Sequence, residues 1–273
     1  MSRLGRVVVV CAVVCAGALV GALASLLLGH THPLGNAGLY TSRYAPAEIM
    51  EHAPVSPEVR AILTAKCADC HSAETRAPLY GRFAPASWLM ERDIVRARDA
   101  MNLSIWERYS ADEQERLRAE IASQAKTGMM PPVQYRVIHR NATLTDTDVA
   151  ALTQWARGGV LRVSDAPGEA LTEGDALRGK DVFERRCTGC HAMDQDREGP
   201  RLRGVFGRSS GSVPGFDYSP ALQKAHLVWN EATLEKWLAD PDALVPGNAM
   251  EFHVAKAQER RDLIRYLRES AAK

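Results

Sequence analysis

The apolar and polar positions divide the 273-residue chain into one long apolar run near its start and two later stretches with helical periodicity. Residues 7–28 form the apolar run, which has no charged side chain and follows Arg3 and Arg6. Twenty-two residues in a helix can span the hydrocarbon core of a bilayer. The two arginines place the N-terminal end in the cytoplasm and the rest of the chain on the other side. We therefore expect residues 1–28 to form a transmembrane helix.

A cleaved secretory signal is the alternative for the same segment, with Ala22-Leu23-Ala24 as the small-residue cleavage site. The run stays apolar through Leu28, beyond that site, and is long for the apolar region of a signal peptide, which favours an uncleaved anchor. Residues 29–52 lack a sustained period and contain several Gly and Pro residues, so they predict a tether. The histidines of this tether are expected to be solvated: His30, His32 and His52.

Residues 53–161 predict a first small helical domain. Three of its helices are expected to begin near Pro57, Ser87 and Thr145. Ser110 and Glu113 form a capping box that opens a further helix, and Gly128 ends this helix. The helices carry apolar side chains along one face, as a domain with a single core requires.

A second small domain is predicted at residues 174–273, after a short linker at residues 162–173 that has few apolar side chains. Asp175 and Asn230 are the expected N-caps of two of its helices. The last helix is amphipathic, with apolar positions at Leu263, Ile264 and Leu267. The whole pattern predicts an all-α fold of two helical domains in tandem, without an extended sheet, behind the N-terminal helix.

Charge adds little to this picture, whereas cysteine changes it. The 34 Lys and Arg residues against 33 Asp and Glu give a formal net charge of +1, which does not indicate a nucleic-acid partner. Two of the six cysteines, Cys11 and Cys15, lie in the apolar run, where we expect them to act as small apolar fillers. The other four belong to two motifs, so no pair is left for a structural disulfide outside the apolar run.

The two cysteine motifs have the same spacing. Cys187-Thr188-Gly189-Cys190-His191 places two thiols three residues apart with an imidazole directly after them, and Cys67-Ala68-Asp69-Cys70-His71 repeats the arrangement. This is the spacing for covalent haem attachment through two thioethers, with the histidine as the proximal iron ligand. A zinc or redox Cys-x-x-Cys is the alternative, and the repetition weakens it. We therefore predict two covalently bound haem c groups, which would add apolar surface to a core poor in aromatic residues.

Each predicted haem iron needs a sixth ligand or keeps an open site. A methionine on a Pro-rich strap is a frequent solution, because such a backbone cannot be helical and holds the sulfur against the ring. Met130 and Met250 each lie on such a strap, sixty residues after the second cysteine of their motif. We choose Met130 for the first haem and Met250 for the second. At the first haem, His139 and an open site are the alternatives.

Other residues of the second domain fit the surroundings of a haem. A backbone carbonyl at or near Pro200 can accept a hydrogen bond from the ring N–H of His191, which would fix the imidazole. Asn248 can donate a hydrogen bond near the sulfur of Met250. The candidate donors to buried haem propionates are Arg208, Tyr218 and Trp229.

A series of motifs runs through the first domain. It consists of Cys67, Cys70, His71 and Ser72, then Thr75, Pro78 and Tyr80, then Ser87-Trp88, then Asn102, Ser104 and Trp106, then Gly128, Met130 and Pro131-Pro132, then Tyr135 and His139, and finally Leu144-Thr145 and Trp155-Ala156. This order resembles a bacterial haem-binding domain family over nearly the whole domain. The resemblance implies a c-type haem and leaves the distal ligand and the partner open, because the family is functionally mixed.

A denser series of motifs runs through residues 174–270. It consists of Gly179 and Phe183, then Cys187, Cys190 and His191, then Gly199-Pro200, Leu202, Gly204 and Phe206-Gly207-Arg208, then Pro214-Gly215-Phe216 and Tyr218, then Trp229, then Pro246-Gly247, Met250 and Phe252, and finally Asp262-Leu263-Ile264 and Tyr266-Leu267. This series resembles class I cytochrome c of the mitochondrial and cytochrome c2 type. The resemblance implies His191 and Met250 as axial ligands and three propionate contacts, Arg208, Tyr218 and Trp229. It also implies that Gly179 and Phe183 pack the first helix against Tyr266 of the last.

Two departures from that family change the expectations. Trp237 stands where the family usually has a tyrosine in the haem pocket, which removes a hydroxyl near Met250. The lysines with which family members dock on oxidases are largely missing, and Asp242 and Glu251 lie in that region instead. The resemblance therefore does not imply docking on an acidic oxidase surface.

These observations predict a membrane-anchored electron carrier rather than an enzyme. We expect a single-pass protein of the bacterial inner membrane with both haem domains in the periplasm, because the apolar helix carries them across the membrane. Its expected partners are redox proteins, such as a membrane quinol-oxidising complex and a terminal oxidase or reductase. A di-haem peroxidase and a haem-based gas sensor are the alternatives, and both would need an open site in the first domain.

Overall fold

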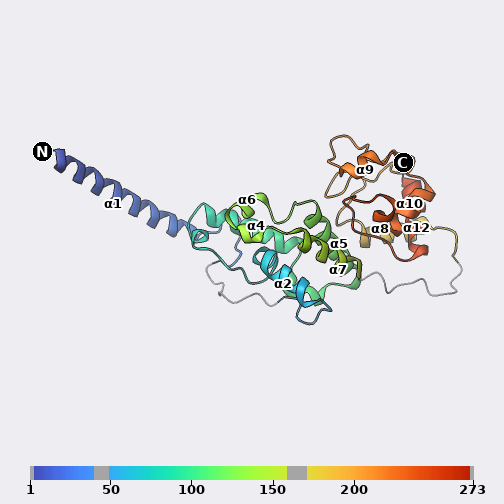
Figure 1. Cartoon of the computed structure of the whole chain (residues 1–273), viewed down its shortest axis with the longest axis horizontal. Helices are drawn as coiled ribbons and strands as arrows, with labels where there is room; N and C mark the ends of the chain where they lie inside the picture. The colour runs from blue at the N-terminus through green and yellow to red at the C-terminus, as the bar shows by residue number, and fades with distance from the viewer. Residues whose placement is uncertain (1–2, 40–48, 159–170, 271–273) are drawn as a thin grey trace. The chain divides into compact units, whose positions relative to one another are not determined.

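The computed structural model describes residues 3–39, 49–158 and 171–270 (Figure 1). In this part of the chain the regular structure is helical, and one isolated β-bridge between Ser209 and Val228 stands in place of a sheet. The all-α prediction is therefore confirmed. The chain forms two compact units, Met1–Glu107 and Arg108–Lys273, and each is described by itself. Most of the predicted linker at residues 162–173 lies outside the described residues.

The first unit begins with α1 (Arg3–Gly29), the one helix among the described residues that is long and apolar enough to cross a membrane. A membrane anchor and an N-terminal signal sequence both have such a length and composition. The end of α1 is tied to the unit, since Ser25 Oγ donates to the Ala84 carbonyl at 2.6 Å and Trp88 Nε1 donates to the Leu28 carbonyl at 3.1 Å.

The other helices of the first unit are α2 (Pro57–Lys66), α3 (Ala68–His71), η1 (Leu79–Arg82), α4 (Ala86–Ala100) and η2 (Leu103–Arg108). Helix α2 begins where the sequence predicts, because the Ser56 side chain accepts a hydrogen bond from the Val59 amide and Pro57 occupies the first turn. Helix α4 begins within one residue of the predicted Ser87. Helix α2 leads into the first cysteine motif, and α4 packs beside it.

The described ends of the predicted tether pack against the first unit. Ala37 and Leu39 are buried in one cluster with Ile94, and Arg60 donates to the carbonyls of Ile49 and Met50. His32, expected to be solvated, instead has its Nδ1 2.7 Å from the buried carboxylate of Glu91. Residues 40–48 of the tether lie outside the described residues.

The helices of the second unit are α5 (Ala111–Lys126), α6 (Val133–Ile138), η3 (Arg140–Ala142), α7 (Asp146–Gly158), α8 (Ala176–Arg186), α9 (Pro220–Lys224), α10 (Glu231–Ala239), α11 (Pro241–Leu244) and α12 (Ala257–Ser270). The capping box of Ser110 and Glu113 is formed, and the Asp175 and Asn230 side chains cap α8 and α10 as predicted. The left-handed Gly128 (φ +70°) follows the end of α5.

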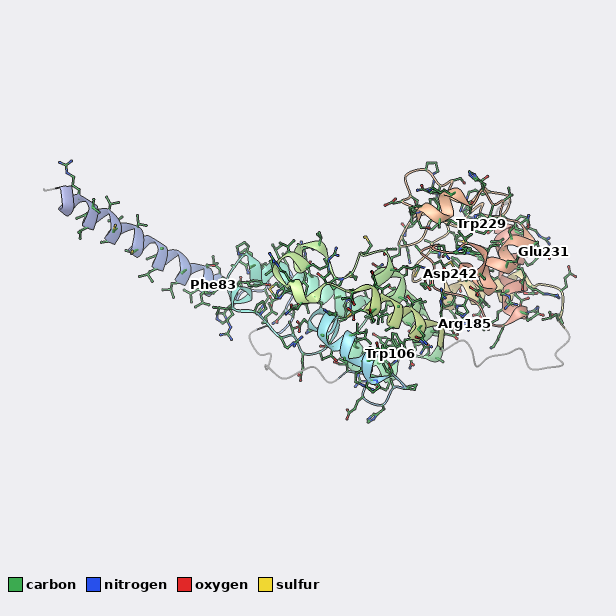
Figure 2. The ribbon with its side chains drawn as sticks, in the orientation of Figure 1. Phe83, Trp106, Arg185, Trp229, Glu231 and Asp242 are labelled. Atoms are coloured by element: carbon green, nitrogen blue, oxygen red, sulfur yellow. The ribbon has the colours of Figure 1, made fainter. Side chains whose placement is uncertain are left out.

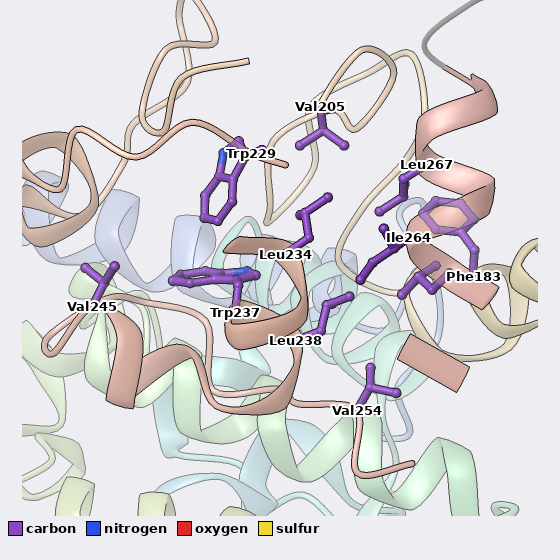
Figure 3. Close-up of a cluster of buried hydrophobic side chains, with 11 residues drawn as sticks. Phe183, Val205, Trp229, Leu234, Trp237, Leu238, Val245, Val254, Ile264 and Leu267 are labelled. Atoms are coloured by element: carbon purple, nitrogen blue, oxygen red, sulfur yellow. The ribbon is translucent and has the colours of Figure 1, made fainter. Parts of the chain in front are cut away.

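The core of the second unit lies between α8, α10 and α12 (Figure 3). Phe183 of α8 packs against Tyr266 of α12 with ring centroids 5.6 Å apart, and Trp229 packs against Trp237 at 5.3 Å. A Cβ atom at Gly179 would collide with the Asp262 carbonyl, so glycine lets α8 and α12 approach closely. The contact of Gly179 and Phe183 with the last helix, implied by the resemblance, is confirmed.

Candidate haem-binding sites

The two Cys-x-x-Cys-His motifs form the same backbone turn, here called the first turn (residues 67–71) and the second turn (residues 187–191). Each turn follows directly from a helix, α2 in the first unit and α8 in the second. In both turns the histidine amide donates to the carbonyl of the first cysteine, at 3.0 Å and 2.8 Å. The second cysteine amide donates to the same carbonyl at 3.2 Å in both. Because i, i+3 and i+4 lie on one side of a helical turn, the two sulfurs and the imidazole are gathered together.

Both imidazoles are oriented by a backbone carbonyl. His191 Nδ1–H donates to the Pro200 carbonyl at 2.8 Å, which confirms the predicted contact. His71 Nδ1–H donates to the Met101 carbonyl at 3.2 Å. A carbonyl only accepts, so the proton lies on Nδ1 in each ring and the Nε2 lone pair is left for a metal.

Burial lowers the pKa of both His71 and His191, although their hydrogen bonds to backbone carbonyls act in the opposite direction. Both rings are therefore neutral near pH 7. The neutral imidazole is the form that binds iron.

The four motif thiols are poor candidates for thiol redox chemistry. Burial raises the pKa of Cys67 to about 12, of Cys70 to about 11 and of Cys187 to about 12. The pKa of Cys190 is raised further by burial, with Glu120 and Glu198 adding to the effect. A redox Cys-x-x-Cys needs a thiolate, which these sites disfavour. A thioether sulfur does not ionise, so its burial does not carry the cost of burying a thiolate charge.

Glycine makes room for the second imidazole. A Cβ atom built at Gly199 would collide with the His191 ring and would lie within 2.7 Å of both ring nitrogens. The loop at residues 199–200 thus contacts the ring face through Gly199 and the ring edge through the Pro200 carbonyl. The donor set, its neutral charge state and this close packing fit a proximal haem ligand.

The three predicted propionate donors lie in one region of the second unit. The Arg208 carbonyl accepts a hydrogen bond from the Trp229 amide at 2.9 Å, and Trp229 (Figure 2) and Tyr218 are both buried. The Arg208 guanidinium donates to the carbonyls of Arg201 and Arg203. Burial lowers the pKa of Arg208 and raises that of Tyr218. The role of these three residues toward propionates stays a prediction.

The Met250 strap (residues 245–251) is shaped by Asn248, whose side chain is fully buried. Asn248 Nδ2 donates to the Val245 carbonyl at 3.0 Å, and its Oδ1 accepts from the Met250 amide at 2.7 Å. One N–H of Nδ2 is used within the strap and the group has a second one, so the predicted donation toward the Met250 sulfur stays a prediction. Asn248 fixes the backbone on which the methionine lies.

The candidates for the sixth ligand of the predicted first haem lie in the second unit. The Met130 side chain is exposed, and its amide donates to the Gln124 carbonyl at the end of α5. His139 follows α6 and stacks on the Tyr135 ring with centroids 4.3 Å apart. The first turn belongs to the first unit, so the choice among Met130, His139 and an open site stays a prediction.

Two charged residues that hold the sites in place were not predicted from the sequence. Arg98 donates to the carbonyls of Ser72, Ala73 and Ala37 and thereby holds the loop after the first turn. Arg186, directly before the second turn, is buried and pairs with Glu115 and Glu259, each at 2.6 Å. No periodicity signals these contacts, because their partners lie 25 to 73 residues away in the sequence.

Comparison with known proteins divides the chain into two matches. Residues 39–158 match the family described as "Haem-binding domain", and residues 176–271 match the family described as "Cytochrome c". Similar relatives include cytochrome c type-1 of Ascaris suum, 45% identical over 38% of this chain and 95% of that protein. Cytochrome c 2.1 of Caenorhabditis elegans is 43% identical over 41% of this chain and 98% of that protein.

A similar solved structure is cytochrome cH from Methylobacterium extorquens. It is 39% identical in sequence and aligns with a TM-score of 0.34, covering 35% of this chain and 99% of that structure.

Proposed function

Because this chain belongs to the cytochrome c family, with a haem-binding domain before its cytochrome c domain, we propose that it is a membrane-anchored di-haem c-type cytochrome. It carries electrons between redox proteins on the periplasmic side of the bacterial inner membrane. The observation that supports two haems is the agreement of the first and second turns in backbone hydrogen bonds and imidazole orientation.

Each haem is bound by two cysteines, a histidine and a methionine. Cys67 and Cys70 hold the first through thioethers and Cys187 and Cys190 hold the second; the iron ligands are His71 and Met130 in the first and His191 and Met250 in the second. A bound haem supplies one-electron chemistry between ferric and ferrous iron. Hydrogen bonds to the Met101 and Pro200 carbonyls keep each imidazole in one tautomer and orientation. Arg208, Tyr218 and Trp229 hold the propionates of the second haem.

The membrane location is supported by α1. Its apolar length is sufficient to cross a bilayer, and Arg3 and Arg6 near its start favour a cytoplasmic N-terminus. The haem domains then lie in the periplasm, within reach of a quinol-oxidising complex and of a terminal oxidase or reductase. Tethering to the membrane raises the effective concentration of the haem domains near such partners.

The number of haems is tested by measuring the mass of the denatured protein expressed in a host that attaches haem c. The wild-type chain is expected to carry two covalent haems. The double variant Cys67→Ala/Cys70→Ala and the double variant Cys187→Ala/Cys190→Ala are each expected to carry one. A control, Cys11→Ala/Cys15→Ala, is expected to keep two. A single haem on the wild-type chain would contradict the di-haem proposal.

Two measurements distinguish an electron carrier from a peroxidase or a sensor: turnover with peroxide, and binding of carbon monoxide to the reduced protein. We expect neither, because six-coordinate iron leaves no site for either ligand. Steady peroxide turnover by the wild-type protein would replace the carrier with a peroxidase, and carbon monoxide binding without turnover would indicate a sensor.

A further inference from the structure

The Met250 strap is contacted from outside the cytochrome c domain by α5 and α7, which belong to the same compact unit. On the N-terminal side of Met250, the Ala249 carbonyl accepts a hydrogen bond from Ser123 Oγ of α5 at 2.7 Å. On its C-terminal side, the Glu251 carboxylate is bound by cations of both helices. Both neighbours of the proposed iron ligand are thus anchored by side chains more than ninety residues away in the sequence.

Glu251 is the centre of these contacts. Its side chain is only 1% exposed, and Lys126 Nζ lies 2.5 Å from Oε1 while Arg157 Nη2 lies 3.2 Å from Oε2. A carboxylate can be buried to this extent only when its charge is paired. Glu251 therefore depends on Lys126 and Arg157, and the strap that carries it depends on them as well.

A second carboxylate ties the other side of the strap to the same cations. Asp242 (labelled in Figure 2) has its Oδ2 3.1 Å from Arg157 Nη2 and its Oδ1 3.6 Å from Lys126 Nζ. The Gly247 amide, within the strap, donates to Asp242 Oδ1 at 3.2 Å. Two acids around Met250 and two bases on α5 and α7 thus form one charge network, with contacts before and after the methionine.

The side chains of α5 and α7 that contact the strap lie outside the residues that match the cytochrome c family. Ser123, Lys126 and Arg157 lie within residues 39–158, which match the haem-binding domain, and outside residues 176–271. The scarcity of docking lysines and the presence of Asp242 and Glu251 then have one explanation. The acidic strap is complementary to the basic side chains of the chain's own preceding helices.

We propose that Ser123, Lys126 and Arg157 are positioning residues that clamp the Met250 strap and so keep the Met250 sulfur on the iron of the second haem. The proposal rests on the proposed function, through the assignment of Met250 as iron ligand. A methionine on a loop leaves the iron when the loop opens, and opening this strap must break the hydrogen bond to Ala249 and the pairs with Glu251. Contact with α5 and α7 therefore lowers the fraction of time in which the iron is open.

The test measures how readily imidazole replaces methionine on the ferric iron of the full-length, haem-loaded protein in detergent. The double variant Lys126→Met/Arg157→Met is expected to bind imidazole about tenfold more tightly than wild type, or more, because strap opening becomes easier. Its second haem is also expected to have a lower midpoint potential, since methionine ligation raises the potential. The charge-preserving variant Lys126→Arg is expected to stay within about twofold of wild type, because it keeps a cation beside Glu251.

Arg185→Met is the matched control. Arg185 Nη1 pairs with Asp112 Oδ2 at 2.6 Å, a contact between α8 and the start of α5 that does not touch the strap. Its imidazole affinity is expected to match wild type. An increase equal to that of the double variant would overturn the clamp, because it would show that any weakening of the α5 contact has the same effect. Ser123→Ala, which removes one hydrogen bond, provides a milder variant if the double variant fails to fold, and its imidazole affinity is expected to rise.

Failure of the ligand assignment is distinguished from failure of the clamp by Met250→Ala. Met250→Ala is expected to remove the part of the near-infrared methionine-to-iron band that arises from Met250. If Met250→Ala leaves that band unchanged, the assignment of Met250 is wrong. If the band is lost but the clamp variants bind imidazole as wild type does, the assignment stands and the clamp is overturned.

Discussion

The orientation of the His191 ring depends on two adjacent residues that the chain places beside it. Pro200 accepts the Nδ1–H hydrogen bond and Gly199 leaves space for the ring. The acceptor could be predicted, because it lies nine residues after His191 and close to the second turn. The corresponding acceptor of His71 could not, because the Met101 carbonyl is thirty residues away and a backbone oxygen has no sequence signature.

Gly199→Ala is expected to disturb the iron ligands of the second haem while leaving the thioethers intact. The added methyl group would overlap the His191 ring, so the ring or the loop must move. Such overpacking typically costs about 1–3 kcal/mol of stability. Guanidinium unfolding of the haem-loaded protein measures this cost, and the low-spin EPR signal of the second haem reports the changed ligation.

Gly158→Ala is the control for that substitution, because a Cβ atom there meets nothing within 4 Å. It is expected to unfold at the wild-type denaturant concentration or slightly above it, because alanine restricts the unfolded chain more than glycine does. If Gly199→Ala also unfolded as wild type does and kept its EPR signal, the close packing of Gly199 on His191 would be refuted.

At the scale of the helices, local sequence signals located most elements but few of their contacts. Capping residues such as Ser110 and Asn230 act on amides within three residues, and for this reason the starts of α5 and α10 could be predicted. The short helices α6, α9 and α11 have too few residues to show a period. The partners of Glu251 were missed because ion pairs between distant helices leave no local pattern.

The junction of α8 and α12 is held by Asp262 and predicts a pH dependence. The Asp262 side chain is 4% exposed and accepts hydrogen bonds from the Arg178 guanidinium at 2.9 Å, the Asp175 amide at 2.8 Å and the Gln258 amide at 3.0 Å. Burial alone would raise the pKa of Asp262, but these hydrogen bonds outweigh it and lower the pKa below its usual 3.8.

Asp262→Asn is expected to lower the free energy of unfolding at pH 7 by roughly 1–3 kcal/mol. A lowered pKa in the folded state stabilises the fold above the unfolded pKa of 3.8, and this contribution is lost as the pH falls through the folded value. The difference between variant and wild type should therefore shrink below about pH 4. Denaturant unfolding at several pH values measures it.

Asp194→Asn is the matched exposed control, since Asp194 pairs with Arg203 at the surface, where such pairs contribute little. It is expected to unfold as wild type does at every pH. A constant deficit of Asp262→Asn down to pH 3 would show that the carboxylate charge is not what stabilises the junction.

At the scale of the whole molecule, the sequence motifs and the compact units divide the chain differently. The haem-binding match spans residues 39–158, whereas the second unit begins at Arg108 and includes α5 and α7 together with the cytochrome c helices. The motifs succeed one another along the sequence, whereas the compact units are defined by contacts between residues. Examples are the ion pair of Glu115 with Arg186 and that of Lys126 with Glu251. The sequence therefore predicted two helical domains, while the contacts of α5 and α7 required the structure.

In the proposed function, both irons of one chain are closed to outside ligands, as an electron carrier requires. The most direct measurement is low-temperature EPR, with near-infrared absorption, on the oxidised full-length protein. Two closed irons are expected to give two low-spin ferric signals of equal intensity, together with methionine-to-iron charge transfer. A high-spin signal that disappears in Cys67→Ala/Cys70→Ala would contradict this proposal, because the first haem would then be open and the protein would belong with the peroxidases or sensors.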